Sequence, residues 1–351
     1  MCAQMRTSPE RNVPMTAMQP SMYPLLFEPA LYERVWGGHQ LETHLGKALP
    51  AGTSHEPVGE SWEIYWKNRV ANGALHGQTL GELITAYPEA MLGSHSADAE
   101  FPLLIKFIDA QDWLSVQVHP DDELARELEG ELRGKTECWY IIDAAPDAQI
   151  AYGFGQQIDA DGFRQAIETG KAGEVMQYVK VAPGDFIYVP ARTMHAIGPG
   201  ILLYELQQTS DTTYRVYDCD RLGLDGKPRQ LHIEKSLRSV RYDVKPQAIT
   251  PYQMQSITKD CTSAAQLITT PYFSLEKRHY QGGDCAPDQV NEAKGAHAIT
   301  VISGSITLKS GNAAPLRLGV GQSVFMPAAL AEYTIVPDGE AEILRAFLPG
   351  R

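Results

Sequence analysis

The residues most able to do chemistry in this sequence are two histidines and a glutamate, each beside an apolar, strand-like run. His119 closes the run WLSVQVH, Glu137 opens ECWYIID, and His195 follows FIYVP after a short loop. Two imidazoles and one carboxylate form a ligand set typical of catalytic zinc, with positions left open for water or substrate. The same set also serves non-haem iron, so these residues alone leave both metals open.

The run that ends at His119 places polar side chains on one face of an expected strand. Side chains alternate in an extended strand, so Ser115, Gln117 and His119 share a face and the valines between them point the other way. A buried polar group left unpaired costs about 1 to 3 kcal/mol. The polar side chains of this face are therefore hydrogen-bonded, bound to a ligand, or exposed to water. An edge strand facing water is the alternative. Pro120 ends the strand and holds the imidazole near a barrel rim, which favours a site.

Two further pairs of charged residues have both a structural and a functional interpretation. Lys135 and Glu137 are two residues apart and therefore co-facial, which suits either a simple ion pair or a metal-site carboxylate with a neighbouring cation. Glu205 lies in the middle of the apolar run ILLYELQQ, and Arg215 follows the turn SDTT. These two residues either form a structural salt bridge or both face a cavity that contains the metal.

The elements that must position these residues are predicted to be mostly strands. Short apolar runs split by Gly, Pro and Asp are typical of a β-sandwich or barrel. Helical spacing of apolar residues predicts four helical insertions. They are expected over residues 80–93, 121–134, 160–173 and 232–243.

An internal resemblance within the chain suggests a duplicated β unit. Residues 181–200 and 318–337 share a turn glycine, a strand, a proline and a loop in the same order, and TECWYIID resembles AHAITVIS at 296–303. The alternative is the chance likeness of any two hairpins. If the duplication is real, Glu137 falls opposite His297 and His195 opposite Glu332.

The tail repeats no His-Pro motif, so a second unit would lack a complete metal set and be structural. The polar segment 245–269 is expected to be a linker into it.

Composition excludes several classes of protein and partner. The formal net charge of −13 argues against nucleic acid and against acidic membrane surfaces, because both need clustered Lys and Arg. Five widely spaced cysteines, an odd number without a C-x-x-C pair, indicate neither a disulfide framework nor a thiolate metal site. The first 22 residues contain no signal-like apolar run, and no stretch is long enough to span a membrane. We therefore expect a cytoplasmic protein.

Taken together and in order, these motifs resemble type I mannose-6-phosphate isomerase, particularly its short bacterial form. The agreement covers residues 23–245 with specific motifs and the tail more weakly. Its further motifs are VWGG at 35–38, GESWEIYW at 59–66, FPLLIKFIDA at 101–110 and QQTSDTTYRVYDCDR at 207–221.

The resemblance implies a mainly β fold of two cupin-like β-barrel (jelly-roll) domains with short helical insertions. We expect a flexible extension over residues 1–22, a catalytic metal-binding domain over 23–245, and a C-terminal cupin-like domain without a complete metal site over 246–351. By the same resemblance, one zinc ion per chain is held by Gln117, His119, Glu137 and His195.

The implied activity is the reversible isomerisation of mannose 6-phosphate and fructose 6-phosphate through a cis-enediol. Its catalytic residues would be Glu205, Lys135 and Arg215. Glu205 is the leading candidate for the base, because a carboxylate on an apolar strand has a raised pKa, and Lys135 beside a dication is the rival. Substrate contacts would come from Lys106, Ser115, Lys135 and Arg215.

The only partner expected is a small sugar phosphate, and the chain is expected to be a monomer or a homodimer. Two alternatives keep the cupin fold: an iron-dependent dioxygenase, and a non-catalytic sugar-phosphate-binding protein.

Overall fold

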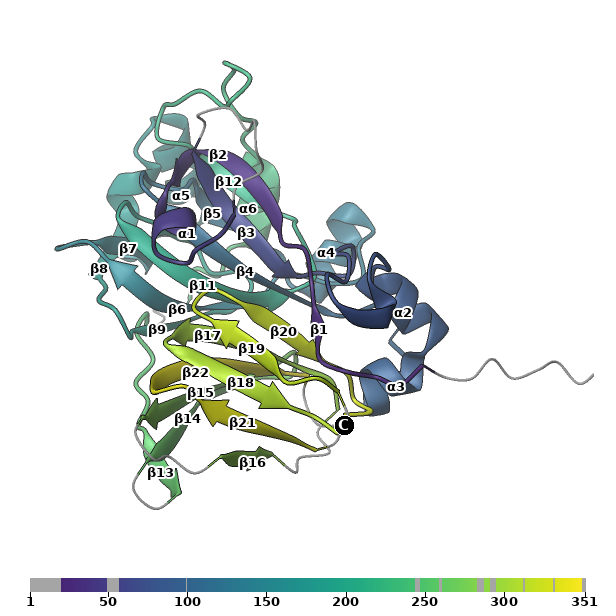
Figure 1. Cartoon of the computed structure of the whole chain (residues 1–351). Coiled ribbons are helices and arrows are strands. Elements are labelled where there is room, and N and C mark those ends of the chain that lie inside the picture. Colours follow the sequence, from purple (N-terminus) through teal and green to yellow (C-terminus); the bar gives the residue numbers. More distant parts are fainter. Residues whose placement is uncertain are drawn as a thin grey trace, which may run out of the picture.

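The described residues form four antiparallel β-sheets that pack as two sandwiches, one above the other in Figure 1. The computed structural model describes residues 20–48, 57–98, 100–243, 247–258, 261–282, 287–290, 295–311, 313–330 and 332–348. This mainly β architecture is the one that the many short apolar runs predicted.

The first sandwich is formed by strands between Ala30 and Tyr217. Its six-stranded sheet has the order β2-β3-β4-β11-β6-β9, with strands Ala30–Gly38, Val58–Ile64, Leu103–Ala110, Ile201–Gln208, Glu137–Ala144 and Phe186–Val189. Its five-stranded sheet has the order β12-β5-β10-β7-β8, with strands Tyr214–Tyr217, Val116–Val118, His195–Ile197, Gln149–Phe154 and Met176–Lys180. Apolar side chains of both sheets meet in one buried cluster between them.

The second sandwich combines one N-terminal strand with the C-terminal strands. Its seven-stranded sheet has the order β1-β20-β17-β22-β15-β14-β13, with strands Leu25–Leu26, Ser323–Met326, His297–Ser303, Glu340–Phe347, Ser274–Gln281, Thr262–Thr269 and Gln255–Thr258. Its four-stranded sheet has the order β16-β21-β18-β19, with strands Asp288–Val290, Tyr333–Pro337, Ser305–Lys309 and Leu316–Gly319.

The two sandwiches pack against each other through their larger sheets. Strand β11 shows why, because its side chains alternate between two apolar environments. Tyr204 and Leu206 belong to the cluster shared with the second sandwich, whereas Leu203 belongs to the interior of the first. Glu205, on the same face as Leu203, points into the first sandwich. The second sandwich therefore supports from behind the sheet that carries Glu205.

The strand order of the second sandwich repeats that of the first. The order β13-β14-β15-β22-β17-β20 corresponds to β2-β3-β4-β11-β6-β9, and β16-β21-β18-β19 corresponds to β5-β10-β7-β8. Within these sheets Glu137 pairs with Val189, and His297 pairs with Met326. The duplication expected from the sequence is thus supported by the strand order, with Glu137 and His297 at corresponding positions. The strand that corresponds to the one starting at His195 starts at Tyr333, so the expected match of His195 with Glu332 is off by one residue.

Helices fill the connections of the first sandwich, and the four predicted helical segments are confirmed. The α-helices are α1 to α6, at Gln40–Thr43, Leu80–Ala86, Pro88–Leu92, Asp122–Glu129, Ala160–Glu168 and Ile233–Ser239. Short 3-10 turns η1 to η3 lie at Gly73–Leu75, Gly93–His95 and Ala172–Val175.

Helix α4 ends earlier than predicted, because Gly130 adopts the left-handed conformation (φ 72°) that closes a helix. None of the helices in the described ranges is long and apolar enough to cross a membrane.

Two expectations from the sequence are corrected by the structure. The segment 245–269 is not simply a linker, since β13 and β14 form within it and pair with each other. Its Ala, Ser and Thr residues gave little apolar signal. Cys261 is disulfide-bonded, although the odd and widely spaced cysteines indicated no disulfide. The predicted boundary at 245/246 and most of the predicted extension lie outside the described residues, so the domain division stays a prediction.

Candidate active site

A cavity of about 590 Å³ opens between the two sheets of the first sandwich, and it gathers the residues predicted to do chemistry. Seven of them line its wall: Lys106, Ser115, Gln117, Lys135, Glu137, Glu205 and Arg215. His119 and His195 complete a group with Glu137 whose ligand atoms lie within 4.8 Å of one another.

Strand register explains how residues distant in sequence meet at this cavity. On the five-stranded sheet, Gln117 of β5 pairs with His195 of β10 on one side and with Arg215 of β12 on the other. On the facing sheet, Glu205 of β11 pairs with Lys106 of β4 on one side and Trp139 of β6 on the other. Each sheet thus contributes one cross-strand row of functional side chains.

The two imidazoles are oriented to coordinate a metal ion. Nδ1 of His119 lies 2.9 Å from the Thr212 carbonyl oxygen, and Nδ1 of His195 lies 2.9 Å from the Thr193 carbonyl oxygen. A carbonyl can only accept, so Nδ1 carries the proton in both rings and the Nε2 lone pair faces the site. The Nε2 atoms lie 3.6 and 3.3 Å from the two carboxylate oxygens of Glu137.

Burial keeps both imidazoles neutral, which is the form that binds metals. It lowers the pKa of His119 well below its ordinary value, with Lys135 acting in the same direction. It lowers the pKa of His195 to about 4, against the opposing hydrogen bond to Thr193. The donor set, its tautomers and its charge state therefore fit a divalent ion such as zinc.

Lys135 and Gln117 lie directly beside this ligand group. The Lys135 ammonium is 2.8 Å from Oε2 of Glu137 and 3.2 Å from Nε2 of His119. The Gln117 side-chain nitrogen is 3.3 Å from Nε2 of His195, and its oxygen accepts a 3.1 Å hydrogen bond from Ser115. The amide that the resemblance implies as a fourth ligand therefore lies beside His195.

A chain of alternating charges leads from the cavity rim to Glu205. Arg34 donates from Nε to Glu60 (2.9 Å), Glu60 lies 3.6 Å from the Lys106 ammonium, and that ammonium lies 3.0 Å from Oε1 of Glu205. Lys135 lies 3.8 Å from the same Glu205 oxygen. The salt bridge between Glu205 and Arg215 that the sequence left open is not formed, since Lys106 is the partner of Glu205.

The two carboxylates of this chain differ in their protonation. Burial raises the pKa of Glu205 and the nearby Glu137 charge adds to this, which outweighs the lowering by Lys106 and Lys135. For Glu60 burial also acts to raise the pKa, but Lys106 and Arg34 prevail and lower it to about 2. Glu205 is thus the more easily protonated of the two carboxylates, whereas Glu60 stays ionised.

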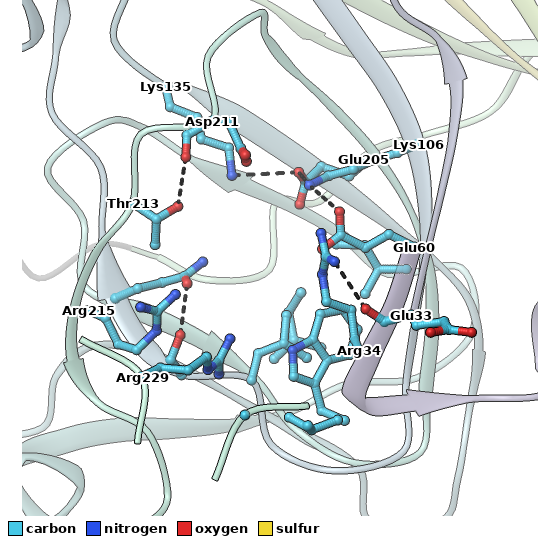
Figure 2. Close-up of a pocket in the computed structure, with 18 of the residues that line it drawn as sticks. Glu33, Arg34, Glu60, Lys106, Lys135, Glu205, Asp211, Thr213, Arg215 and Arg229 are labelled. Carbon is cyan, nitrogen blue, oxygen red and sulfur yellow. Dashed lines mark hydrogen bonds and ion pairs between the residues drawn. The ribbon is translucent and has the colours of Figure 1, made fainter. Parts of the chain in front are cut away.

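Cationic side chains gather at the opposite side of the cavity. Figure 2 shows Arg215 and Thr213 across the cavity from Glu60 and Lys106. Arg215 makes no ion pair among the described residues, and its Nε is buried without a hydrogen-bond partner. Burial and the neighbouring Arg229 lower its pKa. Arg229 is itself held by both oxygens of Asp218. This side of the cavity suits an anion.

Several residues of the cavity wall were not predicted from the sequence, among them Glu60, Trp139 and Arg229. Glu60 carried a usable signal, because it alternates with Trp62 in the motif GESWEIYW and Trp62 donates to it at 2.7 Å. Trp139 also did, being two residues after Glu137 and hence on the same face. Arg229 carried none, because it follows a polar loop without periodicity.

The described part of the second sandwich has no comparable group. Among the described residues, the only His, Cys, Asp and Glu cluster that meets the geometry for a metal ion is that of the first sandwich. The position of Glu205 corresponds to Arg345, which pairs across the strands with Glu276 as Glu205 does with Lys106. A buried guanidinium at that position opposes the binding of a cation.

A jelly-roll sandwich with two imidazoles and one carboxylate at the base of a polar cavity defines this protein as a cupin with a candidate metal centre. The family model for the catalytic domain of type I phosphomannose isomerase matches residues 25–149. The chain is 39% identical over 330 residues to mannose-6-phosphate isomerase ManA of Bacillus subtilis, covering 93% of this chain and 99% of that protein. The protein belongs to the type I mannose-6-phosphate isomerase family.

Further relatives agree with this assignment. The chain is 41% identical over 263 residues to mannose-6-phosphate isomerase of Streptococcus mutans, covering 74% of this chain and 79% of that protein. The crystal structure of mannose 6-phosphate isomerase from Bacillus subtilis has a TM-score of 0.84 at 32% identity and covers 93% of this chain and 100% of that one. A phosphomannose isomerase from Salmonella typhimurium, at 17% identity and a TM-score of 0.72, shares the fold.

Proposed function

We propose that this protein is a zinc-dependent mannose-6-phosphate isomerase that interconverts mannose 6-phosphate and fructose 6-phosphate. The observation that carries the proposal is the grouping of side chains at one cavity. His119, Glu137 and His195 lie close together, and the buried Glu205 lies near them with Lys106 and Lys135. Arg215, which makes no ion pair among the described residues, lies across the cavity. The named relatives act on this substrate, and the chain spans nearly the whole length of most of them.

The reaction moves a proton between carbon 2 and carbon 1 of the open-chain sugar through a cis-enediol. Glu205 is the proposed base, because its raised pKa favours the uptake of a proton and its side chain lines the cavity. Lys135 remains the rival, since its ammonium contacts both Glu137 and His119. The two lysines beside Glu205 would stabilise negative charge that develops on the substrate oxygens.

The metal is proposed to be one zinc ion per chain, held by His119, Glu137 and His195 with Gln117 as a fourth ligand. Bound there, it would act as a Lewis acid toward the sugar oxygens or orient them. No electron is exchanged with an external acceptor in this isomerisation, so a redox-inactive ion suffices. That requirement favours zinc over iron, which has the same ligand preference.

The phosphate group is proposed to lie at the side of the cavity that contains Arg215. An unpaired, partly buried guanidinium suits bidentate contact with a phosphate, and Arg229 and His232 lie on the same wall. Ser115, deeper in the cavity beside Gln117, would contact a sugar hydroxyl. Lys106 forms ion pairs with Glu205 and Glu60, which favours a substrate contact at the reacting carbons over one at the phosphate.

The test is a coupled assay of fructose 6-phosphate formation from mannose 6-phosphate by the purified protein. We expect turnover in the wild type and loss of turnover in Glu137→Ala. Absence of turnover in zinc-loaded wild type would refute the proposal. Binding of mannose 6-phosphate without turnover would support the non-catalytic alternative, and oxygen uptake with iron would support the dioxygenase.

We also propose a cytoplasmic location and a monomeric or homodimeric state. A phosphorylated sugar as substrate supports the first, because such compounds are charged and do not cross membranes unaided. Size-exclusion chromatography with light scattering would settle the second.

A further inference from the structure

A buried indole lies between the carboxylate proposed as base and one of the proposed metal ligands. Trp139 is completely buried, yet its side chain forms part of the cavity wall. Its Nε1 donates a 2.8 Å hydrogen bond to Oε2 of Glu205. Its ring meets the imidazole of His195 edge to face, with centroids 5.5 Å apart and an interplanar angle of 72°.

The pairing of strands in the β-sheet places Trp139 beside Glu205. Trp139 and Glu205 are direct partners across strands β6 and β11, so their Cα atoms are fixed in register and both side chains leave the same face of the sheet. Lys106 pairs with Glu205 from the other side. The Glu205 carboxylate is therefore contacted by a side chain from each of the two neighbouring strands.

The two oxygens of Glu205 have contacts of different kinds. An indole N–H donates only and does not release its proton at any accessible pH, so the Oε2 contact is a fixed one. Oε1 instead faces two ammonium groups, those of Lys106 at 3.0 Å and Lys135 at 3.8 Å. Only Oε1 has neighbours that exchange protons.

Glu60 provides the contrast within the same cavity. It too accepts an indole N–H, from Trp62 at 2.7 Å, but its other oxygen is held by Nε of Arg34 at 2.9 Å. Both oxygens of Glu60 thus have permanently protonated donors, whereas Glu205 has one such donor and one oxygen left for chemistry.

We propose that Trp139 is a positioning residue that fixes Oε2 of Glu205 and so directs Oε1 toward the substrate for proton transfer. This rests on the proposed function, and specifically on Glu205 as the base. Fixing the carboxylate in one rotamer keeps the accepting oxygen within reach of carbons 1 and 2, which is an orientation effect on the chemical step.

The first test is a double-mutant cycle with Trp139→Phe and Glu205→Gln, measured with equal zinc content. Phenylalanine keeps an aromatic ring beside His195 but lacks the N–H. Losing one hydrogen bond to a charged group predicts a fall in kcat of about 10- to 100-fold with little change in KM. In the Glu205→Gln background the same change should have no further effect.

The outcomes separate this inference from the function on which it rests. Wild-type kcat in Trp139→Phe, or an equal fold-loss in both backgrounds, would overturn the role of Trp139 alone. Wild-type turnover in Glu205→Gln would instead remove Glu205 as the base. A loss of bound zinc in Trp139→Phe that accounts for the whole loss of activity would show that the indole acts on His195 and not on Glu205.

A second test needs no activity. The chain has five tryptophans, so its ¹H–¹⁵N spectrum contains five indole signals. The signal missing in Trp139→Phe identifies Trp139, and we expect that signal to shift in Glu205→Gln, because its acceptor loses the negative charge. An unchanged position would show that the indole does not donate to Glu205 in solution and would overturn the proposal.

Discussion

Lys106 and Glu205 are direct partners across strands β4 and β11, and their charged atoms lie 3.0 Å apart inside the first sandwich. In the second sandwich the corresponding pair is Glu276 and Arg345, with the signs of the charges exchanged and 2.9 Å between Oε1 and Nη1. The same backbone register thus holds a buried ion pair in both halves. In the first half the carboxylate lies on β11, whereas in the second half the corresponding strand β22 carries the guanidinium.

Removing the cation of this pair should destabilise the protein strongly. Lys106→Met leaves Glu205 buried without its nearest partner, and breaking a buried pair in this way costs about 3 to 5 kcal/mol. Urea unfolding at pH 7 measures the change. Lys180→Met is a matched control, because Lys180 forms a 2.5 Å pair with Asp147 in which both side chains are mostly exposed. It should cost less than about 1 kcal/mol, and equal losses in the two variants would contradict the account.

Gln117 should contribute to zinc affinity without being indispensable. Gln117→Leu retains His119, Glu137 and His195, so we expect zinc to bind with an affinity lowered about 10- to 100-fold. Competition with a fluorescent chelator measures this. Glu137→Ala should abolish stoichiometric binding, and the exposed His76→Gln should leave it unchanged. An unaltered affinity in Gln117→Leu would remove the amide from the ligand set.

The metal-free protein should lose stability as the pH falls below about 6.5. His195 has a pKa of about 4 in the folded protein, and it protonates near 6.5 when unfolded. Between these values the unfolded chain binds more protons, so the free energy of unfolding falls with decreasing pH. From pH 7 to pH 5 His195 alone should account for roughly 2 kcal/mol.

The measurement is urea unfolding of the chelated protein at both pH values. In His195→Gln the loss between pH 7 and pH 5 should be smaller by about that amount. The same loss in both proteins would mean that His195 is not buried as a neutral imidazole.

Arg215 should act mainly on binding of the phosphate group. Arg215→Lys keeps the charge and loses the bidentate geometry, so we expect KM for mannose 6-phosphate to rise about 10-fold or more. Inhibition by inorganic phosphate should weaken in parallel. Arg164→Lys, an exposed residue of α5 paired with Glu234, serves as the control and should change neither value. Unchanged KM and unchanged phosphate inhibition in Arg215→Lys would show that Arg215 does not bind the phosphate group and has a structural role instead.

Much of the site was predictable because strand alternation is visible in sequence. The spacing of Ser115, Gln117 and His119 fixed one face of one strand, and the pairing of the strands brought that face to His195. The partner of Glu205 was not predictable, because Lys106 lies 99 positions away and only sheet register makes the two residues neighbours. The same holds for Trp139, whose role depends on which strand lies beside β6.

The fold class and the internal repeat were predicted from the sequence. Strands were missed where their side chains are small. Strand β14 contains Ala264 and Ala265 among Ser and Thr, so this part of the segment lacked the apolar alternation that marks a strand. The disulfide of Cys261 left no trace in cysteine spacing. Helix ends were missed where a glycine such as Gly130 decides them.

Isomerase turnover is expected to depend on a zinc ion held by His119, Glu137 and His195. The most direct measurement follows mannose 6-phosphate turnover and bound metal in one sample, before chelation, after it, and after zinc is restored. We expect one zinc per chain at full activity, loss of zinc and activity together, and recovery of both together. Full turnover in protein freed of metal would contradict this expectation.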